Sequence, residues 1–340
     1  MTGRATSMSI RSKSLLKFLL RASVTAALLI WAFRQVDFVE FRQAVQTAKW
    51  QYVIAVWLLT VALFWLRSIK MQVVLRRQDC HVRSGLIFGA TVMTALYSLV
   101  LPGILSTGVK WYVLRKDTGR GSQVFSGMVY NQLSTMVVMT VFGLGALMLT
   151  DPAVLFPNAS LSSWVLPVIC GILLAGVVVF VVLLLNTKTA GAAIKVSAWL
   201  LRPLPPAMRT KAESVLGQIV TFQNAGLRFH SLVASMTVVD TLIGGAVTYM
   251  LAAGAAGATA PVTVFVWLCA MLYVLGRLPI SIANLGVRES LMVVLLSLYG
   301  VQKPAALLVS MVLFSALVFV ALLGAAYQIA WSMQGQQSKS

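Results

Sequence analysis

The chain has 340 residues, of which 59% are hydrophobic and only 10% are charged, and its mean hydropathy is +0.89. This composition excludes a soluble domain with a polar exterior and predicts a polytopic membrane protein. The formal net charge of +19 does not indicate nucleic-acid binding, because the basic residues stand in short segments beside apolar runs. Anionic membrane lipids are the expected partners of cations at such positions, so we expect no nucleic acid.

The sequence offers little for chemical catalysis. Cys80, Cys170 and Cys269 are too far apart for a CxxC redox or zinc motif, and the only histidines are His81 and His230. No close pair of carboxylates falls in a predicted site. We therefore expect no catalytic residue, no metal and no cofactor, and a protein that is not an enzyme.

Apolar runs long enough to cross a bilayer, about 17 to 25 residues each, recur along the whole chain. The first run, 15–33, follows a basic segment and is not followed by a small-x-small cleavage pattern, so it predicts an uncleaved helix. The further predicted spans are residues 50–66, 126–150, 164–186, 231–256 and 304–331. The membrane domain is thus expected over residues 15–331, between cytoplasmic tails at 1–14 and 332–340.

Two more apolar stretches, 86–114 and 262–300, are interrupted in the middle. The first contains YSLVLPGILSTGVKWYVL and the second YVLGRLPISIANLGVRESLMVVL, and both have Leu-Pro followed by Gly-Val and a basic residue. The residues predicted to break these helices are Pro102, Gly103, Gly108, Pro279 and Gly286. A helix break inside a membrane is tolerated when it is buried in protein or lines a water-filled cavity. The alternative is that these residues only kink a continuous helix.

The distribution of Lys and Arg indicates how these stretches enter the membrane, because basic residues concentrate in cytoplasmic loops. The segments after the second span and after residue 114 are both basic, whereas the loop 151–163 has no basic residue. A hairpin at 86–114 that enters and leaves from the cytoplasmic side explains this pattern, and a full crossing by residues 86–101 is the alternative. When the membrane crossings are followed further along the chain, the segment 262–300 is predicted to enter and leave the membrane from the outside.

The predicted fold is therefore an all-α polytopic membrane protein with about six spanning helices and two broken or re-entrant helical hairpins arranged as an inverted repeat. The repeat units are about 15–150 and 164–331, and both termini are cytoplasmic. The basic loop 187–230 contains apolar residues at helical spacing, which are Met208, Ala212, Val215, Leu216, Ile219 and Phe222. This spacing predicts an amphipathic helix on the cytoplasmic leaflet or, as the alternative, a helix that docks a partner.

Charged residues within apolar segments are rare, and each is a candidate for function. Asp240 needs a partner or water at mid-span, whereas Arg67 and Lys70 share a helix end, where they could hold a phosphate or simply extend to the membrane surface. We expect Arg288 to face a cavity as an anion ligand and Glu289 to pair with Lys110 or Arg277. The complete set of predicted lipid-contacting residues is Lys110, Arg288, Glu289, Asp240, Arg277, Asn284, Ser281, Asn131, Arg67 and Lys70.

The segment LPISIANLGVRES, residues 278–290, resembles the LP-x-S-x-G-x-LG-V-R-E signature of the flippase-like membrane domain of bacterial lysylphosphatidylglycerol synthases and their stand-alone relatives. LPGILSTGVKWYVLRKDTG at 101–119 and LRSIK at 66–70 are similar to other parts of that domain. The resemblance implies a protein of the bacterial cytoplasmic (inner) membrane that translocates, or helps to translocate, a lipid with a charged or glycosylated head group. The chain has no room for the soluble aminoacyl-transferase domain of the synthases, so an intramembrane transferase is a weaker alternative.

The chain departs from the family pattern at two places. Thr107-Gly108 stands where the family often has Gly followed by an acidic residue, and Asn131-Gln132 stands where it often has Glu-Arg. Asp240 and Glu289 are then the only carboxylates of the predicted interior, so any proton coupling must involve them. The lost carboxylates give some support to an alternative hypothesis, in which the protein is a non-transporting partner of lipid or glycan biosynthesis enzymes in the cell envelope.

Overall fold

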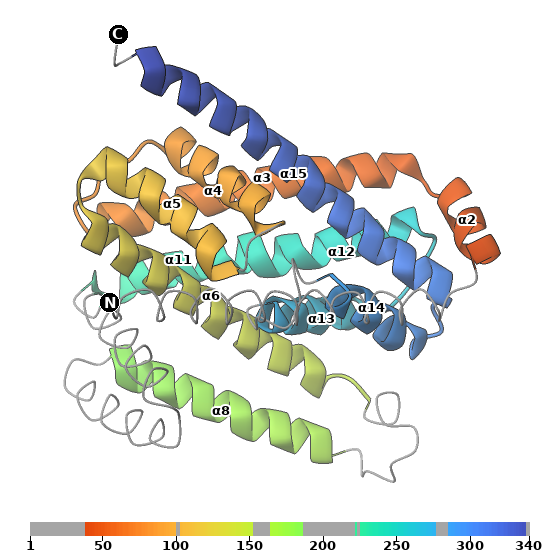
Figure 1. The fold of residues 1–340 in the computed structure, drawn as a ribbon. Helices are drawn as coiled ribbons and strands as arrows, with labels where there is room; N and C mark the ends of the chain where they lie inside the picture. Colours follow the sequence, from red (N-terminus) through yellow and green to blue (C-terminus); the bar gives the residue numbers. More distant parts are fainter. Residues whose placement is uncertain are drawn as a thin grey trace, which may run out of the picture.

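The computed structural model describes residues 38–99, 103–151, 164–185, 222, 225–276 and 285–337, and these residues form helices with no strand among them. A short helix, α2 (Phe38–Gln46), precedes the long helix α3 (Trp50–Arg76). The helices that follow are α4 (Ser84–Ser98), α5 (Gly103–Thr118), α6 (Gly121–Met148), α8 (Val165–Leu185), α11 (Leu227–Thr237), η2 (Val238–Ile243), α12 (Gly244–Ala255), α13 (Val262–Leu275), α14 (Val287–Ser297) and α15 (Lys303–Gln337). Figure 1 shows them as an elongated bundle, with α3, α6, α8 and the α11–α12 stretch running along its length.

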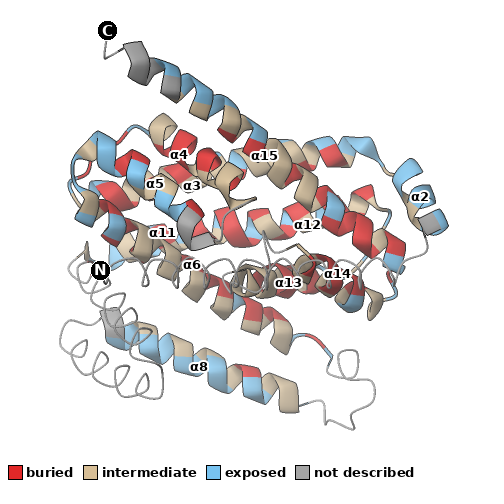
Figure 2. Ribbon diagram, viewed as in Figure 1, coloured by how far each residue is buried: buried red, intermediate tan, exposed pale blue. Residues whose placement is uncertain are grey.

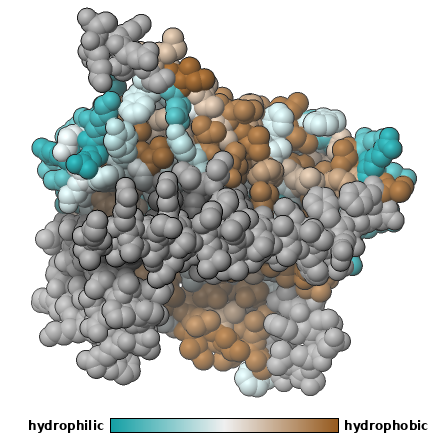
Figure 3. Space-filling model, in the orientation of Figure 1, coloured by the Kyte–Doolittle hydropathy of each residue, from teal (hydrophilic) through white to brown (hydrophobic). Residues whose placement is uncertain are grey.

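Five helical stretches are long and apolar enough to cross a bilayer, namely 50–76, 121–148, 165–183, 227–255 and 303–331. Each overlaps a predicted span, which confirms the prediction of an all-α multi-pass membrane protein. On the face drawn in Figure 3, hydrophilic residues gather toward the two ends of the described surface and hydrophobic residues lie between them. The predicted span 15–33 lies outside the described residues, as does the predicted amphipathic helix except for Phe222.

The two interrupted stretches each contain a pair of shorter helices. Helix α4 ends at Ser98 and α5 begins at Gly103, while α13 ends at Leu275 and α14 begins after Gly286. Gly286 has a φ of 83°, a left-handed conformation that glycine adopts without strain. Pro102 and Pro279 lie outside the described residues.

Gly108 does not interrupt a helix. It lies inside α5, so the prediction that it breaks the chain there is wrong. A glycine in a helix interior costs only about 1 kcal/mol relative to alanine, which the remaining turns of the helix tolerate.

Helix α4 begins and helix α5 ends at the end of the bundle where α3 ends and α6 begins. Arg120 Nη1 donates a hydrogen bond to the backbone oxygen of Asp79 at 3.0 Å, which joins the segment before α4 to the segment after α5. A shared apolar cluster contains Leu75 of α3, Leu114 of α5 and Val124 of α6. The first residue of α4 and the last residue of α5 are therefore at the same end.

The α13–α14 pair lies at the opposite end of the bundle. The backbone N–H of Lys49 donates to the backbone oxygen of Ala255 at 3.1 Å, so α3 begins where α12 ends. A second apolar cluster at this end combines Val53 of α3, Val264 near the start of α13 and Leu296 near the end of α14. Figure 1 shows α4 and α5 (orange to yellow) toward one end of the bundle, and α13 and α14 (blue) toward the other.

Helix α15 holds the bundle together, whereas α8 is peripheral. The α15 helix packs on α4, α14, α12 and α3, and a Cβ at its Gly324 would collide with the backbone oxygen of Val92 in α4. Small residues at such crossings allow membrane helices to approach closely. Figure 2 shows buried residues concentrated in the central helices, while α8, which packs on α6, is mostly exposed or half-buried.

Candidate functional site

Asp240 is fully buried and pairs with two cations of α3. Lys70 Nζ lies 2.9 Å from Asp240 Oδ2, and Arg67 Nε lies 3.2 Å from Asp240 Oδ1. The hydroxyl of Thr241 also donates to Asp240 Oδ1. The Lys70 side chain is 2% exposed and that of Arg67 is 36% exposed, so Arg67 forms the accessible edge of this cluster.

The expectation that Lys70 stands at a helix end near the membrane surface is wrong. Helix α3 continues to Arg76, past the predicted end at residue 66, and Lys70 is inside the protein. Residues three apart share a helix face, so Arg67 and Lys70 both reach Asp240, whose carboxylate compensates an ammonium that would be costly in hydrocarbon. Lys70 Nζ also donates to the hydroxyls of Thr135 and Thr237, both at 3.3 Å.

The backbone around Asp240 is a π-helix, η2, between the α-helices α11 and α12. Short π-helical segments widen the turn by one residue and frequently mark functional sites. Asp240 lies within the segment, Thr237 directly precedes it, and both side chains reach Lys70. The irregular turn thus presents a carboxylate and a hydroxyl to the same ammonium.

Lys110 of α5 adds a third cation to this cluster. It is half-buried and lies within electrostatic range of Lys70, Arg67 and Asp240. No hydrogen bond or ion pair joins Lys110 to another residue within the described part of the chain. Three formal positive charges therefore face one formal negative charge, and in a medium of low dielectric constant this excess attracts an anion.

Asn131 of α6 belongs to the same region. The Thr135 hydroxyl, one turn along α6, donates to the backbone oxygen of Asn131 at 2.8 Å and accepts from Lys70 Nζ. Asn131 Oδ1 is buried and has no hydrogen-bond partner among the described residues. A buried amide oxygen without a partner is uncommon in proteins, and here it can accept a donor from a bound molecule.

Arg288 and Glu289 form a separate cluster at the start of α14. Arg288 Nη2 lies 2.5 Å from Glu289 Oε1, and the Gly286 N–H donates to Glu289 Oε2 at 2.7 Å. The hydroxyl of Ser310 accepts from Arg288 Nε at 2.8 Å and donates to Glu289 Oε1 at 3.1 Å. The guanidinium also lies 5.3 Å from the ring centre of Phe314.

These contacts correct the expected pairing of Glu289 with Lys110. Glu289 caps the first turn of its own helix, where a carboxylate is favourable, and the long Arg288 side chain reaches it from the neighbouring position. The predicted role of Arg288 as an anion ligand is untested, and its pairing with Glu289 favours a structural role instead. Arg277, Ser281 and Asn284 lie outside the described residues.

The structure thus groups five predicted residues, namely Arg67, Lys70, Lys110, Asn131 and Asp240. Among the described residues, no ion pair joins this group to the Arg288–Glu289 pair. Sequence reasoning missed the hydroxyls of Thr135, Thr237 and Ser310. The spacing of Thr237 three residues before Asp240 and of Thr135 four residues after Asn131 was the available signal. Within the described ranges, no group of three or more His, Cys, Asp or Glu residues could hold a metal ion.

The family to which the chain belongs follows from a comparison with known proteins. Residues 18–325 match the family model described as the lysylphosphatidylglycerol synthase TM region. No curated protein and no solved structure gives a significant match. The match extends over most of the chain and confirms the resemblance noted at residues 278–290, so this multi-pass membrane protein belongs to the lysylphosphatidylglycerol synthase transmembrane-region family.

Proposed function

We propose that this protein translocates, or helps to translocate, a polar or anionic lipid between the leaflets of the bacterial inner membrane. The head group of the lipid contacts the cluster of Arg67, Lys70, Lys110 and Asp240, while the acyl chains of the lipid remain in the bilayer. The proposal concerns binding and movement without a chemical step. Family membership supports it, because the family comprises the membrane regions of proteins of lipid synthesis.

The observation that carries the proposal is the half-buried ammonium of Lys110, which lacks a partner among the described residues. A cation held inside a membrane protein is costly unless it is compensated, and such residues usually mark the path of a substrate. Arg67 and Lys70 already share Asp240, which leaves Lys110 for an external anion. A lipid phosphate is the anion that the membrane itself supplies.

The arrangement of the helix pairs supports an inverted repeat as the architecture of the transport route. In this proposal, α4–α5 and α13–α14 are re-entrant hairpins that enter from opposite faces and meet near the midplane. The end that carries α4–α5 is also rich in basic residues, which are Arg76, Arg77, Arg83, Arg115, Lys116 and Arg120. By the positive-inside rule we infer that this end is cytoplasmic, and we propose that both termini lie on the cytoplasmic side.

Lipid movement by the purified full-length protein in liposomes tests the proposal. The probe is phosphatidylglycerol with a fluorophore on one acyl chain, and a membrane-impermeant quencher reports which leaflet holds it. Lys110→Gln removes the charge but keeps a similar length, so we expect movement to slow by about tenfold or more, the loss that corresponds to one charge-assisted hydrogen bond.

Arg76→Gln is the matched control, because Arg76 is an exposed cation in the last turn of α3. It should move the lipid at the wild-type rate. Equal rates for wild type, Lys110→Gln and protein-free liposomes would overturn the proposal and favour a non-transporting subunit of an envelope-lipid complex.

A further inference from the structure

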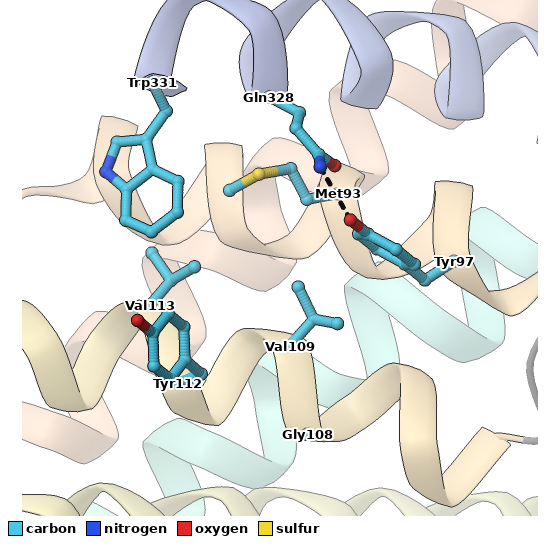
Figure 4. Close-up of a pocket in the computed structure, with 8 residues that line it drawn as sticks. All are labelled: Met93, Tyr97, Gly108, Val109, Tyr112, Val113, Gln328 and Trp331. Atoms are coloured by element: carbon cyan, nitrogen blue, oxygen red, sulfur yellow. Dashed lines mark hydrogen bonds between the residues drawn. The ribbon is translucent and has the colours of Figure 1, made fainter. Parts of the chain in front are cut away.

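A cavity of about 350 Å³ lies between α4, α5 and α15. It is lined by Met93 and Tyr97 of α4, by Gly108, Val109, Tyr112 and Val113 of α5, and by Gln328 and Trp331 of α15 (Figure 4). The lining is mostly hydrocarbon and aromatic ring. Lys110 follows Val109 by about 100° around α5 and does not line this cavity, so the cavity is separate from the cationic cluster.

The cavity has a polar inner end. Gln328 Nε2 donates to the Tyr97 hydroxyl at 2.6 Å, and Figure 4 shows this pair on the opposite side of the cavity from Trp331. From Gly108 to Val113 the helical rise is about 7 to 8 Å, which is about half the hydrocarbon thickness of one leaflet. That depth suits the upper part of a lipid chain.

The outer end of the cavity carries positive charge. Lys116 Nζ lies 4.9 Å from the ring centre of Trp331, and the Arg115 guanidinium lies 4.9 Å from that of Trp111. Both cations are exposed, and Trp331 lies near the C-terminal end of α15, six residues before the helix ends at Gln337. Tryptophan concentrates at the level of lipid head groups, so a mouth at the membrane surface is the position that Trp331 favours.

We propose that this cavity binds one acyl chain of an anionic phospholipid from the leaflet at the basic end, with the head group held by Lys116 and Arg115. The apolar lining matches a hydrocarbon chain, and the two cations at the mouth match a negative head group rather than a neutral one. This inference does not depend on the proposed transport, because a lipid can occupy the cavity without being moved.

Substitution of Gly108 by a larger residue is expected to fill the cavity. A Cβ added at Gly108 would meet no atom within 4 Å, and the residue has helical geometry, so a larger side chain extends into the cavity without moving the backbone. Leucine is also a better helix former than glycine. Gly108→Leu is therefore expected to fold and to fill the space of a bound chain.

Photo-crosslinking tests the proposal on the full-length protein in nanodiscs. The probes are phosphatidylglycerol and phosphatidylcholine, each with a diazirine in the upper part of one acyl chain, and mass spectrometry maps the adducts. For phosphatidylglycerol we expect adducts on Met93 and Tyr112, reduced about tenfold by Gly108→Leu, the effect of losing contact with about two chain methylenes. Lys116→Gln should lower the preference for phosphatidylglycerol over phosphatidylcholine.

Gly176→Leu in α8 is the matched control, because Gly176 is also a helical glycine whose Cβ would meet open space. It should leave the adducts at Met93 and Tyr112 unchanged. Adducts spread over all lipid-facing helices, with no effect of Gly108→Leu, would overturn the proposal. If the protein does not move lipid in liposomes but the adducts at the cavity are retained, only the proposed translocation is rejected. The proposed acyl-chain site then stands.

Discussion

The two charged clusters of this membrane protein differ in how their charges are balanced. At the start of α14, Arg288 and Glu289 neutralise each other, and Ser310 and the Gly286 N–H complete the contacts of the carboxylate. Around η2, Asp240 compensates only part of the positive charge of Arg67, Lys70 and Lys110. The sequence motifs that precede Lys110 and Arg288 are alike, yet only the first cation lacks a partner among the described residues.

We infer from this difference a structural role for the Arg288–Glu289 pair and a binding role for the cluster around Asp240. A neutral, hydrogen-bonded pair fixes the start of a helix and leaves no residual charge, whereas a cluster with excess cations is incomplete without an anion. The π-helical turn at Asp240 also supports a binding role, because irregular backbone inside a membrane protein is retained mostly where a site requires it. Substitutions in each cluster can test the distinction.

Asp240→Asn should have the largest effect on stability. It leaves Lys70 buried without its carboxylate, and breaking a buried ion pair from one side costs about 3 to 5 kcal/mol of the free energy of unfolding. Thermal unfolding of the purified protein in detergent measures the loss. The double variant Lys70→Met with Asp240→Leu removes both charges and should recover most of the stability, so an equally unstable double variant would contradict the ion-pair account.

Arg288→Met should have an intermediate effect, of about 2 kcal/mol. Glu289 loses the guanidinium but keeps the Gly286 N–H and the Ser310 hydroxyl, so the carboxylate is not left without hydrogen bonds. Lipid movement, measured per folded molecule, should stay near the wild-type rate. A folded Arg288→Met protein that no longer moves lipid would make Arg288 a lipid contact and erase the distinction between the clusters.

The spans could be predicted from sequence because only helices with internally satisfied backbones cross a bilayer as single apolar runs. The predicted end of α3 was too early because Arg67 looks like the first residue outside the membrane. Its partner Asp240 stands 173 positions away in the sequence, and no local pattern reveals that pairing. Hydropathy therefore identifies a span but does not show which of its charges are compensated inside the protein.

Individual residues of the site could be predicted from the sequence, but their contacts with one another could not. Charges in apolar segments are rare enough that Lys110 and Asp240 could be selected individually. The capping of α14 by Glu289 depends on the left-handed backbone of Gly286, and the π-helix at Asp240 depends on tertiary packing. Neither is encoded in residue type or spacing alone.

The two glycines of the matched Gly-Val-basic motifs offer the finest test. Gly286 has a φ of 83°, so Gly286→Ala should cost about 1 to 2 kcal/mol, because a Cβ is strained in the left-handed region. Gly108 is helical with open space around it, so Gly108→Ala should be neutral or stabilise the protein by up to about 1 kcal/mol. Thermal unfolding of the two variants side by side measures the contrast. Equal losses of stability in the two variants would mean that both glycines interrupt a helix, as the sequence motif predicts. Opposite signs would show that the same motif starts a helix in α14 but lies within a continuous helix in α5.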